Sequence, residues 1–159
     1  MKTLYIVRHA KAVPHSNHDF ERTLAERGEK EAGAMGDKLR QREIHPTLIL
    51  TSPAARTKAT ADLIAHGIQY DVAAIATDRR LYNAEPDKIL RVVRETSAEI
   101  ESLMIVGHNP GITEFANGIF RTAVTSFPTC GVAGGSVNVQ SWKDLKWGSG
   151  DQEFFEEPD

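Results

Sequence analysis

The sequence contains almost no cysteine and no long apolar segment. Cys130 is the single cysteine among 159 residues, which excludes an internal disulfide and a Cys-x-x-Cys metal or redox motif. This composition suits a reducing cytosol. No apolar run approaches the roughly 20 residues that a membrane-spanning helix needs, and the first stretch, MKTLYIVRH, is charged too early for a signal peptide. We therefore expect a soluble, cytoplasmic protein without a membrane partner.

The sequence also lacks an excess of positive charge. Its 19 Lys and Arg residues and 22 Asp and Glu residues give a formal net charge of −3 at pH 7. Both signs are scattered along the chain, so no basic field is available to neutralise nucleic-acid phosphates, and nucleic acid is not expected as a partner. The length and the 40% hydrophobic content fit one ordinary globular domain. We predict that residues 1–159 form a single domain.

Apolar runs alternate with amphipathic segments along the chain, which predicts strands alternating with helices. Short, continuously apolar runs are typical of strands covered on both faces. They occur at residues 4–7, in TLILTS (47–52) and in LMIVGH (103–108). We further predict a short strand in VAAIA (72–76), a strand with one wet face in SVNVQSW (136–142), and a solvated edge or frayed end from Asp151.

Helix signals separate these strands. Thr23 followed by Glu26 fits a capping box, and Ser52 before Pro53 fits an N-cap followed by proline at the first helical position. The helices are expected at about 24–39, 53–65, 86–95 and 110–120. This order of elements predicts an α/β fold, a three-layer α/β/α sandwich with a mostly parallel central sheet.

Polar residues follow three of the predicted strands, in RHA, TSPAART and GHNPG. Ligands of open α/β sheets bind beyond the carboxyl ends of the strands. If the strands are parallel, one edge of the sheet collects Arg8, His9, Ser52, Arg56 and His108. Two arginines and two histidines would repel one another when charged, so this cluster indicates a site for an anion.

The residue types in this cluster suit phosphoryl chemistry. The planar guanidinium groups of Arg8 and Arg56 match phosphate oxygens and would clamp them. A neutral imidazole is a competent nucleophile toward phosphorus near pH 7, and either His9 or His108 could act in this way. We favour His9, because a strand-end residue backed by a buried strand is rigidly placed for in-line attack. Helix N-termini at the same edge would add N–H donors.

Five stretches of the chain resemble, in order and spacing, the histidine phosphatase superfamily, whose fold is phosphoglycerate mutase-like. They are LYIVRHAKA, DFERTLAERGEKEA, ILTSPAARTKATADLI, RRLYNAEPDKILRVV and LMIVGHNPGITEFA. Within the superfamily they are most similar to short bacterial phosphohistidine phosphatases of the SixA type. The similarity covers nearly the whole chain and weakens after about Thr125. The tripeptide RHA replaces the RHG motif of most members, a departure typical of the short subgroup.

The resemblance implies that His9 is phosphorylated transiently and that water then hydrolyses the phosphoenzyme. It also implies a phosphate pocket formed with Arg8, Arg56 and His108, with Arg22 of the DxxR segment as a further ligand. We also count Asn109 among the substrate-binding residues and expect it to shape the turn that exposes His108. The whole implied site is Arg8, His9, Arg22, Glu85, Arg56, His108 and Asn109. No metal or organic cofactor is expected, and phosphate or sulfate would fit the pocket.

Glu85 has two interpretations. Many superfamily members place an acid near the middle of the chain to protonate the leaving group, and Glu85 in LYNAEPDK stands at about that position. Burial would raise its pKa for this role. It could equally be an acidic residue favoured at a helix N-terminus. Phosphohistidine has a far better leaving group than an alkyl phosphate, so its cleavage depends less on a strong acid.

The expected substrate is phosphohistidine on a signalling or phosphotransfer protein, with a small phosphomonoester as the alternative. A metal-dependent hydrolase using His9, His15, His18 and His108 is a rival, although carboxylate partners at ligand spacing are missing and arginines in the site would oppose a cation. A module that binds phosphorylated proteins without turnover is a second rival. Trapping phosphorylated His9 would separate that module from an enzyme.

Overall fold

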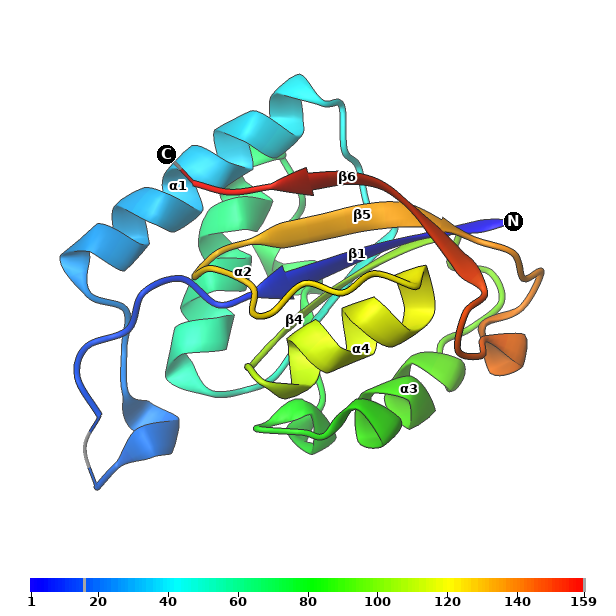
Figure 1. Ribbon diagram of the computed structural model, residues 1–159. Helices are drawn as coiled ribbons and strands as arrows, with labels where there is room; N and C mark the ends of the chain where they lie inside the picture. Colours follow the sequence, from blue (N-terminus) through cyan, green and yellow to red (C-terminus); the bar gives the residue numbers. More distant parts are fainter. Residues whose placement is uncertain (16, 159) are drawn as a thin grey trace.

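A computed structural model describes residues 1–15 and 17–158, and within them one six-stranded sheet forms the centre of the molecule (Figure 1). The strand order is β3-β2-β4-β1-β5-β6. Neighbouring strands are parallel from β3 to β1, and β5 runs antiparallel to both β1 and β6. The prediction of a mostly parallel sheet is therefore confirmed. The strands are β1 (Lys2–Arg8), β2 (Leu48–Thr51), β3 (Ala76–Thr77), β4 (Ser102–Gly107), β5 (Val132–Val137) and β6 (Gly150–Glu156).

Helices cover both faces of this sheet (Figure 1). One face packs against α1 (Glu26–Gln41) and α2 (Ala55–Gly67), and the other packs against α3 (Pro86–Arg94) and α4 (Gly111–Phe120). The three-layer α/β/α sandwich is therefore confirmed. None of the helices in the described residues combines the length and the hydropathy that crossing a membrane requires.

The two hydrophobic cores explain why the central strands are apolar throughout. In β1, Leu4 and Ile6 join the core beneath α3 and α4. Tyr5 and Val7 point the other way and join the core beneath α1 and α2. Successive side chains of a strand point to opposite faces, so a strand between two helical layers has no face left for polar residues.

Both predicted N-caps are wrong. The helix α1 begins at Glu26 after Ala25, and α2 begins at Ala55 after Ala54, neither with a side-chain cap. The segment around Thr23 pairs instead with the chain after β1, because the Val13 N–H donates to the carbonyl oxygen of Thr23 at 2.9 Å. Ser52 continues the sheet pairing from β2, and its hydroxyl lies 2.8 Å from His108 Nε2.

The predictions for the later part of the chain hold in part. The helices expected after Pro86 and Pro110 are α3 and α4. Most of VAAIA is a 3₁₀ turn, and β3 contains only residues 76–77. The fifth strand covers residues 132–137 instead of SVNVQSW, and the acidic tail forms the edge strand β6. Two adjacent glycines hide β5 in the sequence, because glycine is unfavourable inside a strand. The structure needs a glycine at position 134, since a Cβ there would clash with Phe154 of β6.

Gly28 provides a test of how α1 is held against the rest of the fold. A Cβ at this position would clash with the carbonyl oxygen of Lys11, whereas nothing lies within 4 Å of a Cβ at Gly33 in the same helix. We predict that Gly28→Ala lowers the free energy of unfolding by about 1–3 kcal/mol through overpacking. Gly33→Ala, the matched control, should leave it unchanged or raise it by up to about 1 kcal/mol. Denaturant unfolding measures both; equal effects of the two changes would contradict the packing described here.

Candidate active site

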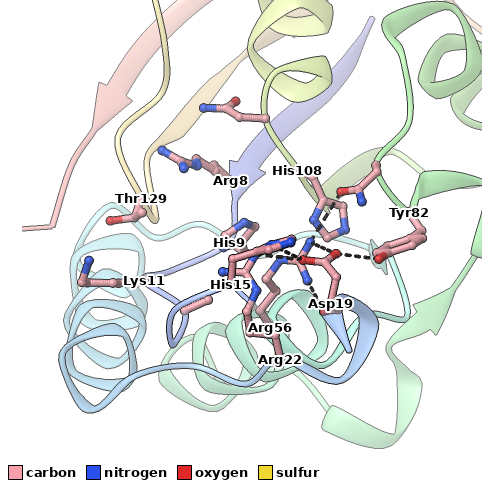
Figure 2. Close-up of a pocket in the computed structure, with 13 residues that line it drawn as sticks. Arg8, His9, Lys11, His15, Asp19, Arg22, Arg56, Tyr82, His108 and Thr129 are labelled. Atoms are coloured by element: carbon pink, nitrogen blue, oxygen red, sulfur yellow. Dashed lines mark hydrogen bonds and ion pairs between the residues drawn. The ribbon is translucent and has the colours of Figure 1, made fainter. Parts of the chain in front are cut away.

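A cavity of about 550 Å³ opens at the carboxyl ends of the parallel strands. Its lining contains six of the seven residues in the predicted site, namely Arg8, His9, Arg22, Arg56, His108 and Asn109. Ala12 and Asn83 also belong to the lining. Figure 2 shows His9, Arg22, Arg56 and Asp19 gathered together, with Tyr82 to one side and Lys11 and Thr129 to the other. The convergence expected for parallel strands is therefore observed.

His9 lies at the end of β1 with one ring nitrogen fixed. Its Nδ1 lies 2.7 Å from the carbonyl oxygen of Ala10. A carbonyl oxygen only accepts hydrogen bonds, so Nδ1 carries the proton and Nε2 carries the lone pair of the neutral ring. Ala10 is held in turn, because its N–H donates to Thr60 Oγ1 of α2 at 2.9 Å. The fold thus selects the tautomer of His9 in which Nε2 carries the free lone pair.

Burial keeps both imidazoles of the cavity neutral. Desolvation lowers the pKa of His9 to about 4, and the charges of Arg56, Arg8 and Arg22 act in the same direction. Desolvation and then the charge of Arg56 lower the pKa of His108 to about 3. The two ring centroids are 5.5 Å apart. Neutral rings can lie this close to arginines because they are not repelled by the guanidinium charges. Only a neutral ring has a lone pair with which to act as a nucleophile.

The three arginines reach the cavity from different segments. Arg8 at the end of β1 donates through Nη1 to the carbonyl oxygen of Phe127 at 2.7 Å. Arg22 follows the 3₁₀ turn Asp19–Glu21 and donates through Nη1 to the carbonyl oxygen of Val13 at 3.0 Å. Arg56, in the first turn of α2, is 3% exposed. Backbone carbonyl oxygens position Arg8 and Arg22, and the carboxylate of Asp19 forms ion pairs with Arg22 and Arg56.

Among the described residues, the buried side-chain nitrogens without a hydrogen-bond partner belong to residues that line this cavity. In the described part of the chain, the buried side-chain atoms that lack a hydrogen bond are Nε of Arg8, Arg22 and Arg56 and Nδ1 of His108. All four belong to residues that line the cavity. An unsatisfied buried polar group costs about 1–3 kcal/mol, and more when charged. Unsatisfied polar groups that gather at one place are typical of a functional site. Because most of these groups are cationic hydrogen-bond donors, the ligand expected here is an anion.

Two predicted residues are placed differently from the rest. The side chain of Asn109 lines the cavity, but its amide nitrogen donates to Ser126 and Phe127 and its amide oxygen accepts from Thr113. Glu85 precedes α3, is exposed and does not line the cavity. Asn109 thus holds the chain segment beside the cavity, and Glu85 lies outside it.

Some lining residues escaped the sequence-based prediction of the site. Asp19 and Tyr82 line the cavity but do not belong to the predicted site. Tyr82 OH lies 2.6 Å from Asp19 Oδ2, although 63 residues separate them. No local pattern reports such a contact. His15 lines the cavity with its side chain 79% exposed, while His18 does not belong to the lining. Among the described residues, no group of three or more His, Cys, Asp or Glu side chains is arranged to hold a metal ion.

Comparison with known proteins identifies the family. The profile of the histidine phosphatase superfamily (branch 1) matches residues 4–85, which include His9, Arg22 and Arg56. The chain belongs to the histidine phosphatase superfamily. The uncharacterized protein ML1117 of Mycobacterium leprae is 32% identical over 96% of this chain and 99% of that protein. The relationship therefore extends along nearly the whole length.

Solved structures place the chain in the SixA-like part of the superfamily. A proposed phosphohistidine phosphatase SixA from Agrobacterium tumefaciens is 28% identical, covers 99% of both chains and superposes with a TM-score of 0.82. A protein histidine phosphatase SixA complexed with tungstate shares the fold, with a TM-score of 0.83 at 16% identity over 98% of this chain and 97% of that one. The expected phosphoglycerate mutase-like fold and SixA-like family are thereby confirmed.

The neutrality of the two imidazoles gives a prediction that needs no substrate. In NMR titrations, His9 should take up its proton near pH 4 and His108 near pH 3. Both pKa values lie below the ordinary value of about 6.5 for an unfolded chain, so the unfolded state binds more protons between pH 7 and pH 4 and stability should fall as pH is lowered through this range. Protonation of either ring between pH 6 and pH 7 would contradict the burial described here.

Proposed function

We propose that this histidine phosphatase removes phosphoryl groups through a covalent intermediate on Nε2 of His9. The observation that carries the proposal is the pairing of a neutral, oriented imidazole with four buried nitrogens that lack partners. The imidazole supplies a nucleophile, and the arginines supply donors for a phosphoryl group. An arrangement of this kind stabilises charge as it develops in the transition state.

The reaction then has two displacement steps. In the first, the lone pair of His9 Nε2 attacks phosphorus, the bond from phosphorus to the leaving atom breaks, and its electron pair goes to that atom. In the second, water attacks the phosphorus, the phosphorus–Nε2 bond breaks with its electron pair returning to Nε2, and the protons of the water leave with inorganic phosphate or pass to solvent. Arg8, Arg22, Arg56 and His108 hold the phosphoryl oxygens in both steps. The Ala10 carbonyl stabilises the positive ring charge that forms when Nε2 is phosphorylated.

We propose phosphohistidine on a signalling or phosphotransfer protein as the substrate. Two observations support this choice: the similarity to SixA, and the position of the acidic side chains. Glu85 is exposed outside the cavity, and the pKa of Asp19 is held well below its usual range, first by the hydrogen bond from Tyr82. We therefore expect neither group to protonate the leaving group, because Glu85 lies outside the cavity and Asp19, which lines it, is ionised. Imidazole leaves readily enough that a strong acid is not needed.

The proposal extends to the surroundings of the reaction. We propose that residues 1–159 act as a single domain in the cytoplasm. We also propose that no metal or organic cofactor takes part, because the arginines and Lys11 that line the cavity can neutralise phosphoryl charge, which is one role of a metal ion in such reactions. Activity should therefore be insensitive to chelators.

Phosphate release tests this function directly. A phosphohistidine protein and p-nitrophenyl phosphate are compared in the presence of EDTA. We expect turnover of the phosphohistidine protein and a loss of roughly 10³-fold or more in His9→Ala, because the nucleophile is removed. His45→Ala, a change of an exposed histidine outside the cavity, is the matched control and should remain fully active. Exclusive activity on the small ester would move the substrate class to phosphomonoesters, and binding without turnover would make the protein a phosphoprotein-binding module.

Glu85→Gln tests the proton donor separately. With phosphohistidine as substrate, we expect kcat to change by no more than about twofold, because the exposed carboxylate does not reach the leaving group and imidazole needs little protonation. Steady-state kinetics from pH 5 to pH 8 measure this. A loss of about 10²-fold together with disappearance of the alkaline limb of the pH profile would identify Glu85 as the general acid.

A further inference from the structure

Asp19 lies at the centre of the arginine cluster and contacts two of its members. Its Oδ1 accepts from Arg22 Nη2 at 3.1 Å, and its Oδ2 accepts from Arg56 Nη2 at 3.1 Å. Its carbonyl oxygen accepts from Arg56 Nη1 at 2.8 Å. Tyr82 OH donates to Oδ2 at 2.6 Å (Figure 2). The carboxylate thus occupies guanidinium hydrogens of the kind that a bound phosphoryl group would use.

This carboxylate is the only acidic side chain among the described residues that line the cavity. The same lining carries the cationic side chains of Arg8, Lys11, Arg22 and Arg56. Hydrogen bonds from Tyr82, Arg22 and Arg56 favour the ionised carboxylate. Asp19 is therefore a permanent negative charge inside a cavity built for anions.

The negative charge of Asp19 has opposite effects in the empty cavity and in the cavity that holds a phosphoryl group. In the empty cavity it reduces repulsion between Arg22 and Arg56 and holds both groups in place. When a phosphoryl group is bound, two anions share the same donors, and like charges brought together weaken binding. Interactions that bind ground states tightly do not accelerate a reaction, and slow product release limits many enzymes. Inorganic phosphate among four cations without a counter-ion would leave slowly.

We propose that Asp19 is a positioning residue that also sets the rate of phosphate release. Its carboxylate holds Arg22 and Arg56 in the empty cavity and competes with product phosphate for them. The inference rests on the proposed function, since it requires that inorganic phosphate binds in this cavity. A purely structural role for Asp19 makes the opposite prediction, because misplaced arginines would bind phosphate more weakly.

The direct test is the binding of inorganic phosphate to the full chain, measured by calorimetry and by competitive inhibition. We expect Asp19→Asn, which keeps the size of the side chain but removes its charge, to lower the phosphate dissociation constant roughly tenfold, as removal of a like-charge repulsion should. In steady-state kinetics kcat and KM should fall together. Asp37→Asn removes the same charge from an exposed position outside the cavity and should leave all three constants unchanged.

Two further variants keep the test decisive if Asp19→Asn folds poorly. Tyr82→Phe removes a donor that shares Oδ2 with Arg56, so the carboxylate should hold Arg56 more strongly and phosphate should bind about two- to fivefold more weakly. Asp19→Glu retains the charge and should bind phosphate within about threefold of the wild-type protein.

Unchanged or weaker phosphate binding by Asp19→Asn would overturn the inference while leaving the proposed function in place. Unchanged or tighter binding by Tyr82→Phe would also overturn it. No binding of phosphate to the wild-type protein in the presence of an intact fold would remove the proposed function and this inference together.

Discussion

The hydrogen bond between His9 Nδ1 and the carbonyl oxygen of Ala10 determines how the cavity can be used. It places the proton on one ring nitrogen and leaves the lone pair on the other. In the reaction proposed above, a phosphoryl group held by the arginines would meet a nucleophile of fixed orientation, and no proton would have to be removed before attack. The depressed pKa of His9 has the same consequence, because the ring stays neutral at pH values where a free histidine would be largely charged.

The sheet provides the constraint that brings these groups together. Three parallel neighbours, β2, β4 and β1, end at the same edge of the sheet. Ser52, His108 and His9 follow these ends, and the contact of 2.8 Å between Ser52 and His108 ties two of the segments. Thr60 of α2 holds the segment after His9. Residues from distant parts of the sequence thus form one rigid site, and rigidity is what in-line attack requires.

The sequence predicts the parts of the molecule that depend on local pattern. Continuous apolar runs locate β1, β2 and β4, and prolines locate α3 and α4 to within a residue. The convergence of Arg8, His9 and His108 then follows from parallel pairing, and Arg56 joins them because α2 begins shortly after the end of β2. The capping signals fail because Thr23 and Ser52 interact with residues that are distant in the sequence. The carbonyl oxygen of Thr23 accepts from Val13, and the hydroxyl of Ser52 contacts His108. The glycine pair of β5 hides this strand from sequence analysis, and tertiary contacts explain the pair: Phe154 fills the space beside Gly134, and the backbone of Asp151 lies close to Gly135. The contact between Asp19 and Tyr82 joins two loops, and no periodicity encodes it.

The most direct test of the central claim is to trap the covalent intermediate. The protein is mixed with a phosphohistidine substrate, quenched under alkaline conditions that preserve phosphohistidine, and analysed by peptide mass spectrometry and ³¹P NMR. We expect a single phosphoryl group on His9, attached through Nε2, which forms and decays within one turnover. Turnover with the phosphoryl group on His108 or on another residue, or turnover without any phosphorylated protein, would contradict it.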